Sequence, residues 1–88
     1  MYQPFNAVTG KPYEGKNILI LSEAALKLET TDARWMTYLQ AKSQGWQVRK
    51  GSKGTTIKAV REQSQEGDAK PIIRHYTVFN AIQVDGIS

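Results

Sequence analysis

The 88-residue sequence contains no cysteine, a single histidine and no long apolar run. Without cysteine the chain has neither a disulfide framework nor thiolate ligands for a metal ion. His75 stands alone, with no His-Glu-x-x-His pattern, so the usual structural and catalytic zinc sites are excluded. The longest apolar run, Ile18 to Leu21, is far shorter than the roughly 20 residues that span a bilayer. We therefore expect no metal, no cofactor, no membrane segment and a cytoplasmic location.

Groupings that support catalysis are also missing from the sequence. Asp32, Asp85 and the glutamates form no close acidic cluster suited to two magnesium ions. Neither a serine nucleophile elbow nor a phosphate-cradling Walker sequence is present. A chain of this length buries only about 60–65% of its unfolded surface, so an internal catalytic cleft is hard to build. The sequence predicts a protein that is not an enzyme.

Positive charge is concentrated in one stretch of the sequence. The net charge is +4, and the stretch from residue 42 to residue 61 contains six basic residues and no Asp or Glu. The six are Lys42, Arg49, Lys50, Lys53, Lys58 and Arg61. Phosphate backbones attract surfaces of this kind. A nucleic acid is therefore the expected partner, although charge alone does not distinguish it from an acidic protein surface.

The hydrophobic pattern predicts one α+β domain over residues 1–88. Residues 1–16 are punctuated by proline and glycine and are expected to form a leader loop. A long helix is predicted from Asn17, its N-cap, and apolar residues cover so much of its circumference that we interpret it as a central buried helix. Thr37 and Gln40 form a capping box, which predicts a short helix over 38–44 that ends at Gly45.

Three strands complete the predicted fold. Residues 46–49 and 55–61 alternate in polarity around turn residues, so we interpret 46–61 as a basic β-hairpin. Residues 62–70 are polar and are expected to form a mobile loop. A strand from Ile72 to Phe79 adds to the hairpin. The predicted architecture is one long buried helix and one short helix packed on a small antiparallel sheet of about three strands.

Binding an unpaired strand requires cations for the phosphates and flat side chains on which bases stack. Arg49, Lys50 and Lys53 at the expected hairpin tip are the leading phosphate contacts. We expect the hairpin and the leader loop to form the two sides of a positive groove, with the leader loop placed beside the anion-attracting start of the long helix. The candidate nucleic-acid-binding residues are Lys11, Tyr13, Lys16, Asn17, Arg34, Trp35, Trp46, Arg49, Lys50, Lys53 and Lys58.

These candidates also have structural interpretations. A basic turn is commonly just solvated, and Tyr13 can pack on the core with its hydroxyl in water. Aromatic side chains on strands and helices are more often core residues than stacking surfaces, which applies to Trp35, Tyr38, Trp46 and Tyr76. His75 is expected to be an ordinary strand residue.

The order of residues along the chain resembles a known family. The matching residues are Asn6, Thr9, Gly10, Tyr13, Gly15 and Asn17, then Asp32, Arg34, Trp35, Met36, Thr37, Gln40 and Ala41, then the run Gly45 to Thr55 without Ser52, and finally Val78, Phe79, Asn80 and Gln83. The sequence resembles the N-terminal single-stranded-DNA-binding domain of ArdC-type antirestriction proteins, which is also found in primases of conjugative plasmids. The resemblance implies an α+β domain ahead of a metallopeptidase or primase domain that is absent from this chain.

Charge and resemblance lead to the same expected function. It is sequence-nonspecific binding of single-stranded DNA by the N-terminal module of an antirestriction or conjugation-related protein, whose other partner is a downstream catalytic domain. The alternative is a protein-interaction or targeting module whose basic hairpin docks on an acidic partner surface. RNA binding also stays open, because no sequence feature indicates whether the protein contacts the 2′-hydroxyl that distinguishes RNA from DNA. Oligomeric state is not predicted.

Overall fold

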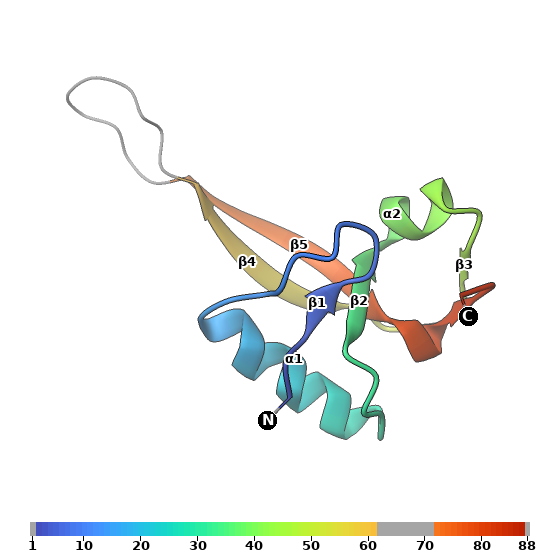
Figure 1. The fold of residues 1–88 in the computed structure, drawn as a ribbon, viewed down its shortest axis with the longest axis horizontal. Coiled ribbons are helices and arrows are strands. Elements are labelled where there is room, and N and C mark those ends of the chain that lie inside the picture. Colours follow the sequence, from blue (N-terminus) through green and yellow to red (C-terminus); the bar gives the residue numbers. More distant parts are fainter. Residues whose placement is uncertain (1, 62–71, 88) are drawn as a thin grey trace.

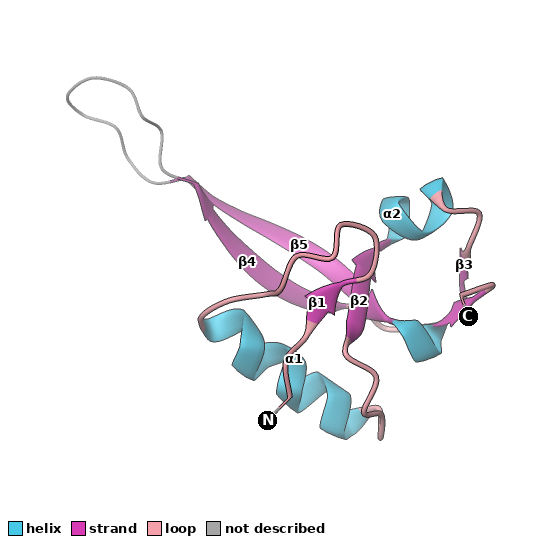
Figure 2. Cartoon of the chain, in the orientation of Figure 1, coloured by secondary structure: helices cyan, strands magenta, loops and turns pink. Residues whose placement is uncertain are grey.

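A computed structural model describes residues 2–61 and 72–87 and has an α+β fold (Figure 1). Within these residues, two α-helices, one 3₁₀ helix and six strands follow one another along the chain (Figure 2). The predicted α+β class is confirmed. The predicted mobile loop over 62–70 lies outside the described residues. No helix in the described part of the chain has the length and apolar character needed to cross a membrane.

The main sheet is mixed and has four strands, in the order β1-β2-β5-β4. β1 (Phe5–Asn6) pairs in parallel with β2 (Arg34–Thr37), and β2 pairs antiparallel with β5 (Ile72–Asn80). β5 in turn pairs antiparallel with β4 (Thr55–Arg61), and these two long strands form a ribbon that extends away from the rest of the fold (Figure 1). The predicted third strand is thus confirmed. The expected three-stranded antiparallel sheet is wrong in strand number and direction.

The predicted β-hairpin over 46–61 does not form. β3 (Gln47–Val48) pairs with β6 (Val84–Asp85) in a second, two-stranded sheet, whereas β4 pairs with β5. The turn between β3 and β4 is held by two hydrogen bonds to Gln83, whose carbonyl accepts from the Arg49 amide at 2.8 Å and whose Nε2 donates to the Lys53 carbonyl at 2.9 Å. Alternating polarity identified both strands correctly, but it does not specify which strand each one pairs with.

Helix α1 (Lys16–Lys27) covers one face of the main sheet and is not a central buried helix. Only Leu21 and Ala25 are buried, and they belong to a core cluster with Trp35, Ile57 and Val78. Leu19 and Leu26 are 69% and 78% exposed, because a helix on one face of a sheet has its opposite side in solvent. The N-cap is Gly15 at φ 62°, not Asn17, which lies inside the first turn.

Helix α2 (Tyr38–Ser43) starts where the capping box predicted. The Gln40 amide donates to Thr37 Oγ1 at 3.1 Å, and the Thr37 amide donates to Gln40 Oε1 at 3.0 Å. Gly45 has φ 78°, the left-handed conformation expected after this helix. Together with β3, β6 and the 3₁₀ helix η1 (Ala81–Gln83), α2 contributes to a second core cluster, which consists of Met36, Ala41, Val48, Ala81 and Val84.

Strand β2 was missed by the sequence analysis, although it lies inside the main sheet. Its residues Trp35 and Met36 are both fully buried and belong to the two different core clusters, one on each face. A strand covered on both faces lacks the polar alternation that identifies half-buried strands. The leader loop likewise contains the short strand β1, followed by a turn in which the Asn6 amide donates to the Lys11 carbonyl at 2.8 Å.

Candidate nucleic-acid interface

The leader loop and the β4–β5 ribbon enclose two adjoining clefts, which we call the inner cleft and the outer cleft and, together, the leader groove. The inner cleft has a volume of about 350 Å³ and is lined by Asn6, Tyr13, Asn17, Thr37, Gln40, Ile57, Lys58, Ala59, Tyr76 and Val78. The outer cleft, of about 800 Å³, is lined by Pro12, Tyr13, Glu14, Gly15, Lys16, Asn17, Lys58, Ala59 and Ile73. Four residues are common to both clefts, so the groove is continuous.

Asn17 joins the two walls of the leader groove. Its Nδ2 donates to the Lys58 carbonyl at 2.6 Å, and its Oδ1 accepts from the Lys58 amide at 3.0 Å. Because β4 is an edge strand, these backbone groups point away from β5, and the asparagine amide satisfies both as a neighbouring strand would. Asn17 was predicted as a helix cap and DNA contact. Its amide does not cap α1 but holds the start of α1 against β4, and the predicted DNA contact stays a prediction.

A second amide, Asn6, organises the inner end of the groove. Its Oδ1 accepts from the amides of Val8 and Thr9 at 2.9 and 3.0 Å, so its Nδ2 faces the cleft. This nitrogen donates to Tyr13 Oη at 3.1 Å and to Gln40 Oε1 at 2.8 Å. Sequence analysis matched Asn6 to the family without giving it a role. Its position at the end of a strand and before a turn is typical of such amide-capped loops.

Burial raises the pKa of the Tyr13 phenol, and the hydrogen bond from Asn6 opposes this only in part. The ordinary pKa of tyrosine is already near 10, so the hydroxyl keeps its proton at neutral pH. Tyr13 is half-buried and packs against the first core cluster, as the structural interpretation proposed, yet it also lines both clefts. It therefore presents a neutral hydrogen-bond donor to the groove.

Lysine side chains stand around the outer cleft. Lys16 at the start of α1 and Lys58 on β4 both line it and are exposed, and Lys11 is exposed in the leader loop. Within residues 2–61 and 72–87, none of the three has a salt-bridge partner. Glu14 also lines the outer cleft and reduces the local positive charge. The outer cleft still has a cationic rim on both walls.

Arg34 and Trp35 do not form the predicted clamp for a base or phosphate. The Arg34 guanidinium binds Asp32 at two points, with Nη2 to Oδ2 at 2.8 Å and Nε to Oδ1 at 3.0 Å. The hydrogen bonds from Arg34 are the main reason why the pKa of Asp32 lies below its ordinary value. Trp35 is 0% exposed and donates from Nε1 to Tyr2 Oη at 2.7 Å. It is a core residue, which rules out stacking on a base.

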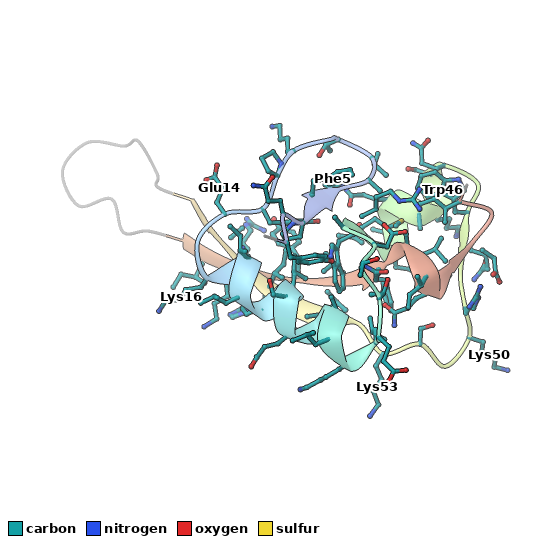
Figure 3. All side chains as sticks on the ribbon, turned by 60° about the horizontal axis from the view of Figure 1, so that its bottom comes forward. Phe5, Glu14, Lys16, Trp46, Lys50 and Lys53 are labelled. Carbon is teal, nitrogen blue, oxygen red and sulfur yellow. The ribbon has the colours of Figure 1, made fainter. Side chains whose placement is uncertain are left out.

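The turn between β3 and β4 lies apart from the leader groove. Figure 3 shows Lys16 at one end of α1 and Lys53 and Lys50 toward and beyond the other end. Lys53 shares a third cleft of about 520 Å³ with Lys27 near the end of α1. Arg49 forms an exposed salt bridge with Asp85 at 2.8 Å. The expected groove between this turn and the leader loop is thus not formed, because β4 begins at the opposite end of the helix.

Two further aromatic residues, Trp46 and Tyr76, differ in position, while Tyr38 on α2 is 47% exposed. Trp46 is half-buried, packs against the second core cluster and lies beside Gly86, so its ring is partly covered. Tyr76 is 38% exposed and lines the inner cleft, since it pairs with Ile57 across the ribbon and shares its face. Tyr76 is thus the aromatic that the structure adds to the groove. His75 is an exposed strand residue opposite Lys58, as expected.

In the described ranges, no three side chains of histidine, aspartate or glutamate gather where one ion would bind them.

Comparison with known proteins places the chain in a family. A family profile described as the N-terminal domain of anti-restriction factor ArdC matches residues 1–79. DNA primase TraC of Escherichia coli is 37% identical over 98% of the chain. The uncharacterized protein y4eC of Sinorhizobium fredii is 37% identical over 94% of it. The resemblance found in the sequence is thereby confirmed.

Solved structures share the fold as well as the sequence. The metal-free crystal structure of the antirestriction protein ArdC from plasmid R388 is 41% identical over 98% of the chain, with a TM-score of 0.78. The Mn(II)-bound structure of that protein is 39% identical over 99% of the chain, with a TM-score of 0.84. The chain spans 33–36% of ArdC, 31% of y4eC and only 7% of the primase.

Proposed function

Because the chain belongs to the family of N-terminal domains of anti-restriction factor ArdC, we propose that it binds single-stranded DNA with little dependence on sequence. In this proposal it is the N-terminal module of an antirestriction or conjugation-related protein. Its second partner is then a downstream domain in a longer chain. The much greater length of the relatives supports this view of the domain as one part of a larger protein.

The observation that carries the proposal is the leader groove itself. Its rim carries Lys16 and Lys58 on opposite walls, and its interior carries the partly exposed Tyr76 beside apolar side chains. Proteins that hold an unpaired strand combine a basic groove for the backbone with aromatic rings for the bases. A duplex has its bases already stacked and paired, so it would leave the aromatic part of this groove unused.

The start of α1 strengthens the phosphate-binding side of the groove. Gly15 at the N-cap provides no side-chain cap, so the first-turn amides are not satisfied by a capping side chain. The amide ends of a helix attract anions, and Lys16 lies at the same point. We therefore assign the principal phosphate contacts to Lys11, Lys16 and Lys58.

The basic turn after β3 has a lesser part in this proposal. The Arg49 charge is already paired with Asp85, and the cleft that Lys53 shares with Lys27 lies at the far end of α1. We assign Lys50 and Lys53 to a peripheral basic surface that attracts the strand by charge alone. The role we infer for the whole domain is binding, and we assign no catalytic residue to it.

Fluorescence anisotropy with labelled 12-mers tests the proposal directly. We expect clear binding to unrelated single-stranded DNA sequences and much weaker binding to a duplex of the same length. With about three phosphates neutralised, log affinity should fall against log salt with a slope of about −2. The RNA strand of the same sequence reports whether the sugar hydroxyl matters.

Three outcomes would contradict the proposal. Duplex binding as strong as single-strand binding would remove the role of exposed bases, and a salt slope near zero would remove the role of phosphate contacts. Binding to an acidic protein surface, with no affinity for any of the oligonucleotides, would favour the protein-interaction alternative.

A further inference from the structure

The inner cleft contains two hydrogen-bond donors for which residues 2–61 and 72–87 provide no acceptor. Gln40 Oε1 accepts from the Thr37 amide at 3.0 Å and from Asn6 Nδ2 at 2.8 Å. A backbone amide can only donate, so the oxygen of the Gln40 side chain must face it and Nε2 must face away. Tyr13 Oη accepts from the same Asn6 nitrogen at 3.1 Å, which leaves its own proton available.

The orientation of this network is determined throughout by backbone groups. Asn6 Oδ1 accepts from two backbone amides, so Asn6 Nδ2 can only donate to Tyr13 and Gln40. Because both residues bond to one nitrogen atom, they are neighbours at one end of the cleft. In the part of the chain that the structure describes, neither Gln40 Nε2 nor the Tyr13 proton has an acceptor.

The rest of the inner cleft is apolar and aromatic. Ile57 and Val78 are buried in its floor, and Tyr76, on the same face of the ribbon, leaves part of its ring exposed. The cleft volume of about 350 Å³ lies at the lower end of the range for small-molecule sites, which is about 300–1,000 Å³. An apolar slot with an aromatic wall and donors at one end suits a flat heterocycle with acceptors on its edge.

We propose that the inner cleft holds one unstacked base of the bound strand and prefers guanine to adenine. Guanine presents two adjacent acceptors, O6 and N7, on one edge, and these match the donors of Tyr13 and Gln40. Adenine carries an amino donor in place of O6, so donor would face donor at that position. This inference rests on the proposed function and adds a modest base preference to it.

The test compares dA₁₂ with the same strand carrying one central guanine, by anisotropy at fixed salt. A matched pair of hydrogen bonds discriminates between bases by about 1–3 kcal/mol in the major groove of DNA, so even the low end predicts about fivefold tighter binding in the register that places the guanine in the cleft. The all-adenine host prevents the strand from sliding to place another acceptor base in the cleft.

Gln40→Glu is the decisive variant. Glutamate keeps the oxygen that the Thr37 amide and Asn6 need, and it is itself a favoured residue in a capping box, so α2 is preserved. The substitution replaces the Nε2 donor by an acceptor, and we expect the guanine preference to disappear or reverse. Tyr13→Phe removes the other donor. It should reduce the difference in log affinity between the guanine strand and the adenine strand to about half.

Gln44→Glu is the matched control, because it makes the same charge change at the exposed C-terminal end of the same helix. It should lower binding of both strands equally and leave their ratio unchanged. Equal affinity of the parent protein for both strands, or a preference that Gln40→Glu leaves intact, overturns the inference while the proposed function stands. Failure to bind either strand overturns both.

Discussion

Replacing the two lysines of the outer cleft is the most direct test of where the strand lies. We consider Lys16→Gln with Lys58→Gln, compared with Lys50→Gln with Lys53→Gln. Both double variants remove two positive charges from exposed positions, so long-range attraction falls equally in the two proteins. Any difference between them must come from local contacts with the phosphates.

The expected magnitude follows from counterion release. For a single strand, log affinity changes with log salt by about −0.7 for each neutralised phosphate. Relative to 1 M salt, one contact therefore contributes about 0.7 log unit at about 0.1 M. Loss of the two outer-cleft lysines should weaken binding about 25-fold at that salt and make the slope shallower by about 1.4.

Neither substitution is expected to disturb the fold. The hydrogen bonds to Asn17 come from the backbone of Lys58, not from its ammonium group. Exposed substitutions of this type usually change the free energy of unfolding by less than about 0.5 kcal/mol. Thermal unfolding followed by circular dichroism checks this, and anisotropy titrations from low to moderate salt give the affinity and its slope. The groove assignment fails if the Lys50/Lys53 variant loses as much affinity as the Lys16/Lys58 variant, or more.

Three further substitutions test single features of the structure. Asn17→Ala removes two hydrogen bonds between α1 and β4 and should lower the free energy of unfolding by about 1–2 kcal/mol in urea denaturation, with weaker DNA binding; unchanged stability would show that the clamp is not needed. Trp35→Phe should destabilise the fold because it removes the hydrogen bond from the indole to Tyr2. In the parent protein, the part of the tryptophan emission that this substitution removes should resist collisional quenchers with or without DNA, since the Trp35 ring is buried. DNA-dependent quenching of Trp35 would contradict a core role. Asp32→Asn tests the ion pair with Arg34. Because folding lowers the pKa of Asp32, the stability that its carboxylate contributes is present above the unfolded pKa, near 4, and is lost as the pH falls through the folded pKa. The parent protein should therefore have a larger unfolding free energy than the variant at pH 6, and this difference should shrink near pH 2.

Local signals in the sequence were reliable guides to local structure. The start of α2 was predicted because a capping box involves only residues three positions apart, Thr37 and Gln40. Strand β5 was predicted from a run of strand-forming residues within nine positions. The Gly45 conformation followed from its place directly after a helix. Each of these features depends on backbone geometry within one or two turns of chain.

Errors arose where the outcome depended on which segments meet. The segment 46–49 alternates in polarity whether it pairs with β4 or with β6, so the basic hairpin was a reasonable but wrong interpretation. Trp35 has the same neighbours in sequence whether it is exposed or buried, and its burial comes from a sheet covered on both faces. The hydrogen bonds between Asn17 and Lys58 join residues 41 positions apart, and no local sequence pattern predicts them.

Amino-acid order alone thus determined the class of the fold, its family and the cationic character that favours a phosphate-bearing partner. Those properties follow from composition, from short-range periodicity and from residues matched one by one. Only the folded arrangement decided which lysines share a surface: it placed Lys16 and Lys58 on one groove, paired Arg49 with Asp85, and brought Asn6, Tyr13 and Gln40 together. The physical reason is that strand pairing and helix packing bring residues from distant parts of the chain together, and a binding site is made of such neighbours.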